Sequence, residues 1–112
     1  MRFASAFRGI TSRYGQPITL IQNGEELGTA QALIRPLHDQ ARQVVPTELG
    51  QHQRDTALCL ADPAFPLQTG QTGLVLIQGT DRWTVSSVRP AEAGTERIYW
   101  RLILVRREEE RL

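Results

Sequence analysis

The sequence predicts a mainly β protein, a small antiparallel β-barrel of about six strands with a short N-terminal helix and one long loop. Two observations lead to this prediction. Short apolar and β-branched runs recur along most of the chain, and clusters of Gly, Pro, Asn and Asp separate them. The chain has 112 residues and no internal repeat, which predicts a single domain, 1–112, that buries about two thirds of its unfolded surface.

A helix is predicted at the start of the chain. Phe3, Phe7, Ile10 and Tyr14 recur at helical spacing, which favours an amphipathic helix within residues 1–15. The apolar stripe has two interpretations. It is either a docking surface for a neighbouring subunit or the face that packs against the chain's own core.

Six apolar runs predict the strands of the barrel. These runs are 18–22, 28–37, 56–61, 74–78, 82–88 and 96–105. Asn23-Gly24 is a strong turn signal after the first run, and Gly79-Thr80-Asp81 has the length of a tight hairpin between the fourth and fifth runs. Residues 89–95 are rich in Pro, Ala and Gly, and they predict a turn before the last strand.

Alternation along the last two strands predicts which side chains share a face. Trp83, Val85 and Ser87 fall on one face of the run 82–88, and Trp83 is expected to anchor the core or its rim. The last strand carries apolar groups on both faces. One face has Ile98, Trp100, Leu102 and Leu104, and the other has Tyr99, Arg101, Ile103 and Val105. We therefore expect the second face to be covered, by the N-terminal helix or by another subunit.

Residues 38–55 form a polar stretch without a convincing period, which predicts a long loop. Loops of this length are uncommon in a compact domain unless they bind something or stay disordered, so this loop is the best functional candidate, and an excursion without a task is the alternative. Its candidate residues are His38, Asp39, Gln40, Arg42, Gln43, Val44, Val45, Pro46, Glu48, His52 and Arg54. The tail 106–112 mixes Arg and Glu and is expected to be solvated.

Composition and charge argue against several functional classes. Thirteen basic residues against twelve acidic ones leave a net charge of +1, which is too small for a dedicated binder of DNA or of a membrane surface. All the basic residues are Arg, which mildly favours protein interfaces with acidic partners, although a biased genome composition explains it equally well. The chain has no run of about 20 apolar residues and no signal-peptide order, so we expect synthesis in the cytoplasm and no membrane partner.

No set of residues predicts catalysis or metal binding. His38 and His52 lack ligand spacing, and Ser86 and Ser87 lack a nucleophile elbow. Cys59 is the only cysteine and lies in an apolar run, so it is expected to be a buried thiol without a disulfide. We therefore expect no enzyme, no catalytic residue, no metal and no cofactor. A small barrel that binds single-stranded nucleic acid is an alternative, in which Tyr99, Arg101 and Arg82 would supply stacking and charge.

Several short motifs follow one another along the chain: RYGQPITL at 13–20, ALIRPL at 32–37, ELG at 48–50, LQTGQTG at 67–73, RWTV at 82–85 with Val88, and IYWRLIL at 98–104. Taken in this order, they resemble the head completion or stopper proteins of tailed bacteriophages, of the prophage head–tail joining type. The resemblance spans nearly the whole chain. It implies a β-barrel subunit of the virion neck, made in the host cytoplasm, that forms a ring below the portal and adaptor, closes the DNA channel after packaging and presents a platform for the tail.

The resemblance also implies roles for two parts of the chain. Residues 38–55 correspond to the candidate channel plug, and its mixed charges favour steric obstruction over an electropositive grip on DNA. The candidate subunit interface is Phe3, Phe7, Ile10, Tyr99, Arg101, Ile103 and Val105. The expected partners are further copies of the chain, portal and adaptor proteins and tail terminator or tail tube proteins, with non-specific contact with packaged DNA. A tail terminator subunit and a baseplate or minor tail protein are alternatives of the same fold.

Overall fold

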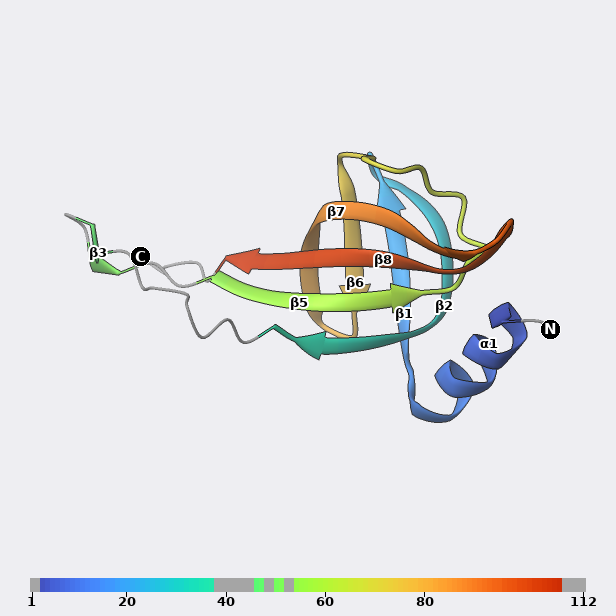
Figure 1. Ribbon diagram of the computed structural model, residues 1–112. Coiled ribbons are helices and arrows are strands. Elements are labelled where there is room, and N and C mark those ends of the chain that lie inside the picture. Colours follow the sequence, from blue (N-terminus) through green and yellow to red (C-terminus); the bar gives the residue numbers. More distant parts are fainter. Residues whose placement is uncertain (1–2, 38–45, 48–49, 52–53, 108–112) are drawn as a thin grey trace.

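The computed structural model describes residues 3–37, 46–47, 50–51 and 54–107, and within them the protein is mainly β (Figure 1). One helix, α1 (Phe3–Tyr14), precedes all the strands. The strands are β1 (Gln16–Gln22), β2 (Glu25–Pro36), β3 (Pro46–Thr47), β4 (Gly50–Gln51), β5 (Arg54–Ala61), β6 (Leu74–Gln78), β7 (Asp81–Ala93) and β8 (Glu96–Arg107). The predicted fold class is confirmed, because six of these strands close into an antiparallel barrel and one short helix precedes them.

The order of strands around the barrel is β1-β2-β5-β8-β7-β6, and β6 pairs with β1 to close it. Two strands therefore separate β1 from β8 in either direction around the wall. Figure 1 shows this arrangement, with β8 at the front and β1 behind it. The outer surfaces of β1 and β8 thus face opposite sides of the molecule.

The interior of the barrel is filled by alternate residues of every wall strand, as the period of two predicts. Leu74 and Leu76 of β6 and Leu102 and Leu104 of β8 are fully buried, and Trp100 is buried among them. Each such large apolar side chain contributes about 1.5–3 kcal/mol when it leaves water. The predicted inward face of the last strand is therefore confirmed for Trp100, Leu102 and Leu104.

A β-bulge changes the predicted alternation in β7. Trp83 and Val85 are buried, but Ser86 is an extra residue between the pairs Val85↔Leu104 and Ser87↔Ile103. The extra residue shifts the face of every later side chain, so Val88 points into the barrel in place of Ser87. The prediction that Ser87 shares a face with Trp83 was wrong for this reason.

The predicted turn before the last strand is confirmed at Gly94 and Thr95, but its predicted extent, 89–95, is wrong, because β7 continues through Pro90 to Ala93. Its partner β6 pairs only with residues 81–84 of β7. Beyond that point one edge of β7 has no neighbouring strand, and Pro90, which has no N–H group to donate, is tolerated there. Pro90 pairs with Trp100 on the other edge.

Several other boundaries differ from the prediction, including the starts of β1 and β2. β5 begins at Arg54, inside the predicted loop 38–55, and β8 ends at Arg107, inside the predicted tail. The two extensions pair with each other, Arg54 with Arg107, because each provides backbone partners for the other. The predicted loop also contains a short ladder of β3 with β4, in which Pro46 pairs with Gln51.

The barrel has two different ends (Figure 1). At one end β2 finishes, β5 begins and β8 finishes, so the segment between Pro36 and Arg54 is attached there. At the other end lie α1 and the turn between β7 and β8. The helix and the inserted segment therefore belong to opposite ends of the domain.

Candidate functional site

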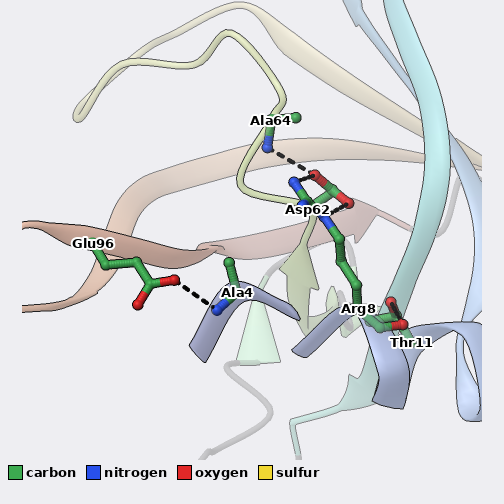
Figure 2. Close-up of polar contacts among 6 residues, drawn as sticks. All are labelled: Ala4, Arg8, Thr11, Asp62, Ala64 and Glu96. Atoms are coloured by element: carbon green, nitrogen blue, oxygen red, sulfur yellow. Dashed lines mark hydrogen bonds and ion pairs between the residues drawn. The ribbon is translucent and has the colours of Figure 1, made fainter. Parts of the chain in front are cut away.

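Helix α1 is held at its N-terminus by an acidic residue of β8. The backbone N–H groups of Phe3 and Ala4 donate hydrogen bonds of 3.2 and 3.0 Å to the carboxylate oxygens of Glu96, and Figure 2 shows the bond from Ala4. The first N–H groups of a helix have no partner within it, and the helix dipole favours negative charge at this end. Glu96 therefore acts as the N-terminal cap of a helix that is 92 residues away in sequence.

An ion pair attaches the middle of α1 to the end of β5. The Arg8 guanidinium donates two hydrogen bonds of 3.1 Å to Asp62, and the Ala64 N–H donates a third of 2.8 Å (Figure 2). Desolvation raises the pKa of the Asp62 carboxyl, but the Arg8 hydrogen bonds, the Ala64 N–H and the Arg8 charge outweigh it, so that this pKa lies below its ordinary value. Asp62 is therefore ionised at neutral pH and fixes the helix to the barrel.

The barrel-facing side of α1 is apolar. Phe7 is 6% exposed and stacks on Tyr99 of β8, with ring centroids 5.1 Å apart. Thr11 is also buried, and its hydroxyl donates to the Arg8 carbonyl at 3.1 Å. Two residues of the predicted subunit interface, Phe7 and Tyr99, thus pack against each other within one chain, as in the second interpretation of the helix.

The remaining apolar residues of α1 lie in the open. Phe3 is 41% exposed, Ile10 47% and Tyr14 69%. Spacings of seven and four residues place them on one side of the helix, next to Phe7. We call these three residues the helix stripe, and within the single chain they are open to solvent, as the first interpretation requires.

The other predicted interface residues lie together on the outside of the barrel. Arg101 is exposed, and Ile103 and Val105 are half-buried on the same face of β8. Leu60 pairs with Arg101 and Leu58 with Ile103 on the neighbouring strand β5. The apolar groups on the second face of β8 thus continue onto β5, beyond the contact of α1 with Tyr99.

The predicted plug residues fall almost entirely outside the described residues. Those outside are His38, Asp39, Gln40, Arg42, Gln43, Val44, Val45, Glu48 and His52. Pro46 lies in β3 and Arg54 is the first residue of β5. The two ends of the segment are close together, because the Leu37 N–H donates a hydrogen bond of 2.8 Å to the Thr56 carbonyl.

Comparison with known proteins adds nothing to these surfaces. The chain matches no protein-family model, no curated protein and no solved structure. A functional interpretation therefore depends on the barrel, its exposed surfaces and the short sequence motifs.

Cys59 lies in the core of the barrel, as its apolar run predicts. Burial raises the pKa of the Cys59 thiol to about 12, so this cysteine is protonated at neutral pH. Across residues 3–37, 46–47, 50–51 and 54–107, no cluster of His, Cys, Asp and Glu has the arrangement of a metal site. In the same part of the chain, no helix is both long and apolar enough to cross a membrane.

Both tryptophans pack in the core of the barrel. Trp100 is buried, its indole N–H donates to the Phe65 carbonyl at 3.1 Å, and the Arg97 guanidinium lies 4.3 Å from its ring centroid. Trp83 is buried beneath Arg106, which lies 4.6 Å from its ring centroid. Cation–π contacts of this kind occupy the ring faces. Neither ring is therefore open for stacking on a nucleic acid base.

The segment after β5 forms a surface feature that sequence reasoning missed. A shallow groove of about 190 Å³ lies between this segment and β2, lined by Leu27, Gly28, Thr29, Ala30, Asp62, Ala64, Phe65 and Pro66. Its only ionisable residue, Asp62, is already bound by Arg8. Nothing in the sequence marks the groove, because it depends on where Phe65 packs.

Proposed function

We propose that this chain is a structural protein of the bacteriophage neck, which forms a ring below the portal and adaptor, closes the DNA channel after packaging and provides the surface to which the tail attaches. The observation that supports the proposal best is the polarity of the barrel. Helix α1 is docked at one end, and the segment between Pro36 and Arg54 is attached at the other. A subunit with two different ends suits a ring, where one end faces the axis and the other faces outwards.

In this arrangement the work is mechanical and involves no catalysis. The inserted segments of many subunits converge on the axis, and ring symmetry adds many weak contacts into one block of the channel. The barrel supplies the rigid wall, and contact with packaged DNA is non-specific. The subunit is made in the host cytoplasm and ends in the neck of the virion.

The open surfaces are assigned to protein partners. The helix stripe of Phe3, Ile10 and Tyr14 docks on the adaptor or portal, since exposed apolar side chains in a contiguous stripe are typical of interfaces. The outer face of β8, with Arg101, Ile103 and Val105, contacts the neighbouring subunit. The tail terminator or tail tube binds the completed ring.

Binding of single-stranded nucleic acid is less well supported. That function needs aromatic faces beside cations, but Phe7 covers Tyr99, and Arg97 and Arg106 lie over the tryptophan rings. Arg101 pairs with Arg89 in the β7–β8 ladder, and Arg89 is seven residues along β7 from Arg82. The two candidate cations, Arg82 and Arg101, are therefore not neighbours. A tail terminator or a minor tail protein of the same fold is the alternative within the phage particle.

Electron microscopy of the purified protein mixed with the portal and adaptor complex of its virus tests the proposal. The expected result is an added ring at the head vertex, below the adaptor. A ring that binds only isolated tail tubes would assign the chain to the tail terminator class. A protein that binds neither, and that binds oligonucleotides with a strong salt dependence, would replace the proposal with the nucleic acid alternative.

A further inference from the structure

Strand β2 has a backbone edge that is open over part of its length. β5 pairs with β2 only from Leu33 to Pro36, so residues 25–32 have no neighbouring strand on that side. Thr29 and Gln31 lie in this open part, and both side chains are exposed. We call residues 25–32 the open edge of β2, and it is the kind of edge to which a further strand adds.

The backbone groups of Thr29 and Gln31 point towards the open edge. Pro17 of β1, which has no N–H, pairs with Gln31, so the hydrogen-bonded pairs of β1 with β2 are those on either side of it. The same alternation along β2 reaches Leu37, whose N–H donates to the Thr56 carbonyl on the β5 side. On that side, the backbone groups of Thr29 and Gln31 form no hydrogen bond with any residue that the structure describes.

Two other open edges of the barrel are protected. β6 does not extend to the start of β1, and Pro17 lies on the edge that is left. β7 continues beyond the end of β6, where it carries Pro90, and its Val88 carbonyl accepts a hydrogen bond of 3.0 Å from the Gly70 N–H. Proline protects an edge because it offers no N–H to a further strand. Residues 25–32 contain no proline, so the open edge of β2 lacks this protection.

The groove between β2 and the segment after β5 lies along the open edge. Thr29 and Ala30 line one side of it, and Phe65 lines the other. Its volume of about 190 Å³ is enough for one apolar side chain, since a cavity of about 150 Å³ holds a benzene molecule. Ala30 is half-buried and lies between the two open residues. An added strand would therefore direct the side chain opposite Ala30 into the groove.

The far side of the groove is fixed by contacts within the chain. The Trp100 indole N–H donates a hydrogen bond of 3.1 Å to the Phe65 carbonyl. Asp62 is held by the Arg8 guanidinium and by the Ala64 N–H (Figure 2). A groove with fixed walls binds a ligand without the entropic cost of ordering those walls.

We infer that the open edge of β2 binds an extended segment of another protein as an additional strand. An extended polypeptide fits because it carries the N–H and C=O groups that match those of Thr29 and Gln31 at strand spacing. The groove adds a preference for an aliphatic side chain at the position opposite Ala30. The partner segment thus has three residues in strand conformation, with an aliphatic residue between two that face solvent. This inference goes beyond the neck function and does not depend on it.

Hydrogen exchange of the free protein tests whether the edge is open. The Thr29 and Gln31 amides should exchange at least roughly tenfold faster than the Ala30 amide, which faces β1. Slow exchange at both positions would show that the edge is already covered and would overturn the inference. Protection of both amides that increases with protein concentration would make a second copy the donor of the strand, and would overturn the assignment to another protein.

NMR titration with the acetylated and amidated pentapeptide Lys-Thr-Val-Thr-Lys tests the binding. At millimolar peptide, the amide signals of Thr29 and Gln31 should shift and reach saturation. The matched control is the same peptide with both threonine nitrogens methylated, which keeps every side chain but donates no hydrogen bond to the edge. It should bind roughly tenfold more weakly or worse. Equal binding of the two peptides, or no saturable shift at these amides, would overturn the inference.

A pair of variants at one position separates the backbone from the side chain. Gln31→Pro removes an N–H from the edge and should weaken peptide binding roughly tenfold, whereas Gln31→Ala keeps the N–H and should bind as the wild type does. Thr29→Pro replaces the first variant if that one does not fold. Unchanged binding in a folded proline variant would place the peptide elsewhere and overturn the inference.

The outcomes are independent of those for the proposed function. A chain that binds no peptide at β2 but adds a ring to the head vertex would overturn this inference and leave the neck function standing. A chain that binds the peptide at β2 but adds no ring would do the reverse.

Discussion

Two glycines of the N-terminal region differ in the space around them: Gly15 is closely surrounded, whereas Gly9 is open. Gly15 joins α1 to β1, and a Cβ atom there would lie 2.5 Å from the Thr11 carbonyl oxygen and 2.9 Å from that of Ala32. Both are backbone atoms, which do not move aside easily. Gly9 lies inside the helix, and a Cβ atom there would meet nothing within 4 Å.

The same substitution should therefore have opposite effects at the two positions. Gly15→Ala should lower the free energy of unfolding by about 1–3 kcal/mol, the usual cost of forcing atoms into filled space. Gly9→Ala should raise it by about 0.5–1 kcal/mol, because alanine is the better helix former. Urea denaturation measures both, and a stabilised Gly15→Ala would contradict the close approach at the junction.

Asp62 makes the stability of the protein depend on pH. Its folded pKa lies below its ordinary value, so its contribution is fully present above the unfolded pKa of about 3.9 and is lost as the pH falls through the folded pKa. Asp62→Asn should cost about 1 kcal/mol at pH 7, a modest value because half of the Arg8 side chain is exposed and solvent screens the pair.

The difference between wild type and Asp62→Asn should shrink as the pH is lowered, because the wild-type carboxyl becomes neutral too. Urea denaturation at a series of pH values from 7 to about 2 measures it. A difference that stays constant over this range would show that the charge of Asp62 does not stabilise the helix.

At the scale of single elements, α1 is the least local part of the fold. It contacts β2, but the hydrogen bonds and the ring contact that fasten it are with Asp62, Tyr99 and Glu96, all far along the chain. Burial of Phe7 makes the largest single contribution to the free energy that docks α1 on the barrel, because the burial and stacking of an aromatic ring contribute more than an exposed ion pair.

Phe7→Ala should therefore lower the free energy of unfolding by about 3 kcal/mol, whereas Phe3→Ala should cost less than about 1 kcal/mol, because Phe3 is 41% exposed. Hydrogen exchange of the α1 amides should accelerate in Phe7→Ala. Equal costs for the two substitutions would mean that the helix is not docked by Phe7.

The sequence predicts elements well where the signal is local. Alternation in the last strand identified Trp100, Leu102 and Leu104 as inward because neighbouring residues alone set the period. The same rule failed at Ser87, because the extra residue of a bulge is settled by pairing with β8. It failed at Pro90 because the tolerance of a proline depends on how far β6 extends.

At the scale of the molecule, we expect the barrel to fold without the inserted segment. The Leu37 N–H is bonded to the Thr56 carbonyl, so β2 and β5 are already joined where the segment leaves the wall. Deleting residues 40–53 should keep cooperative unfolding and the circular dichroism spectrum of the barrel. Loss of the folded signal in this variant would contradict the separation.

The same deletion tests the plug. Virus particles assembled with it should carry a ring at the vertex but lose their DNA, as measured by the fraction of filled heads in electron micrographs. Filled and stable heads would remove the plug from the proposal while leaving the ring.

Sequence alone could suggest the candidate interface residues but not where they lie. Arg101, Ile103 and Val105 share a strand face by simple alternation, so their proximity was predictable. The continuation of this face onto Leu58 and Leu60 was not predictable, because it depends on the pairing of β8 with β5. Phe7 was assigned to an interface and is covered by Tyr99, since only the folded chain brings helix and strand together.

The hydrogen bond between Leu37 and Thr56 has a practical consequence for protein engineering. Because this bond holds the two ends of the segment together, residues can be added or removed between them at a free-energy cost that grows only with the logarithm of the length. A fluorescent label or an affinity tag should therefore be accepted there without redesign of the barrel wall.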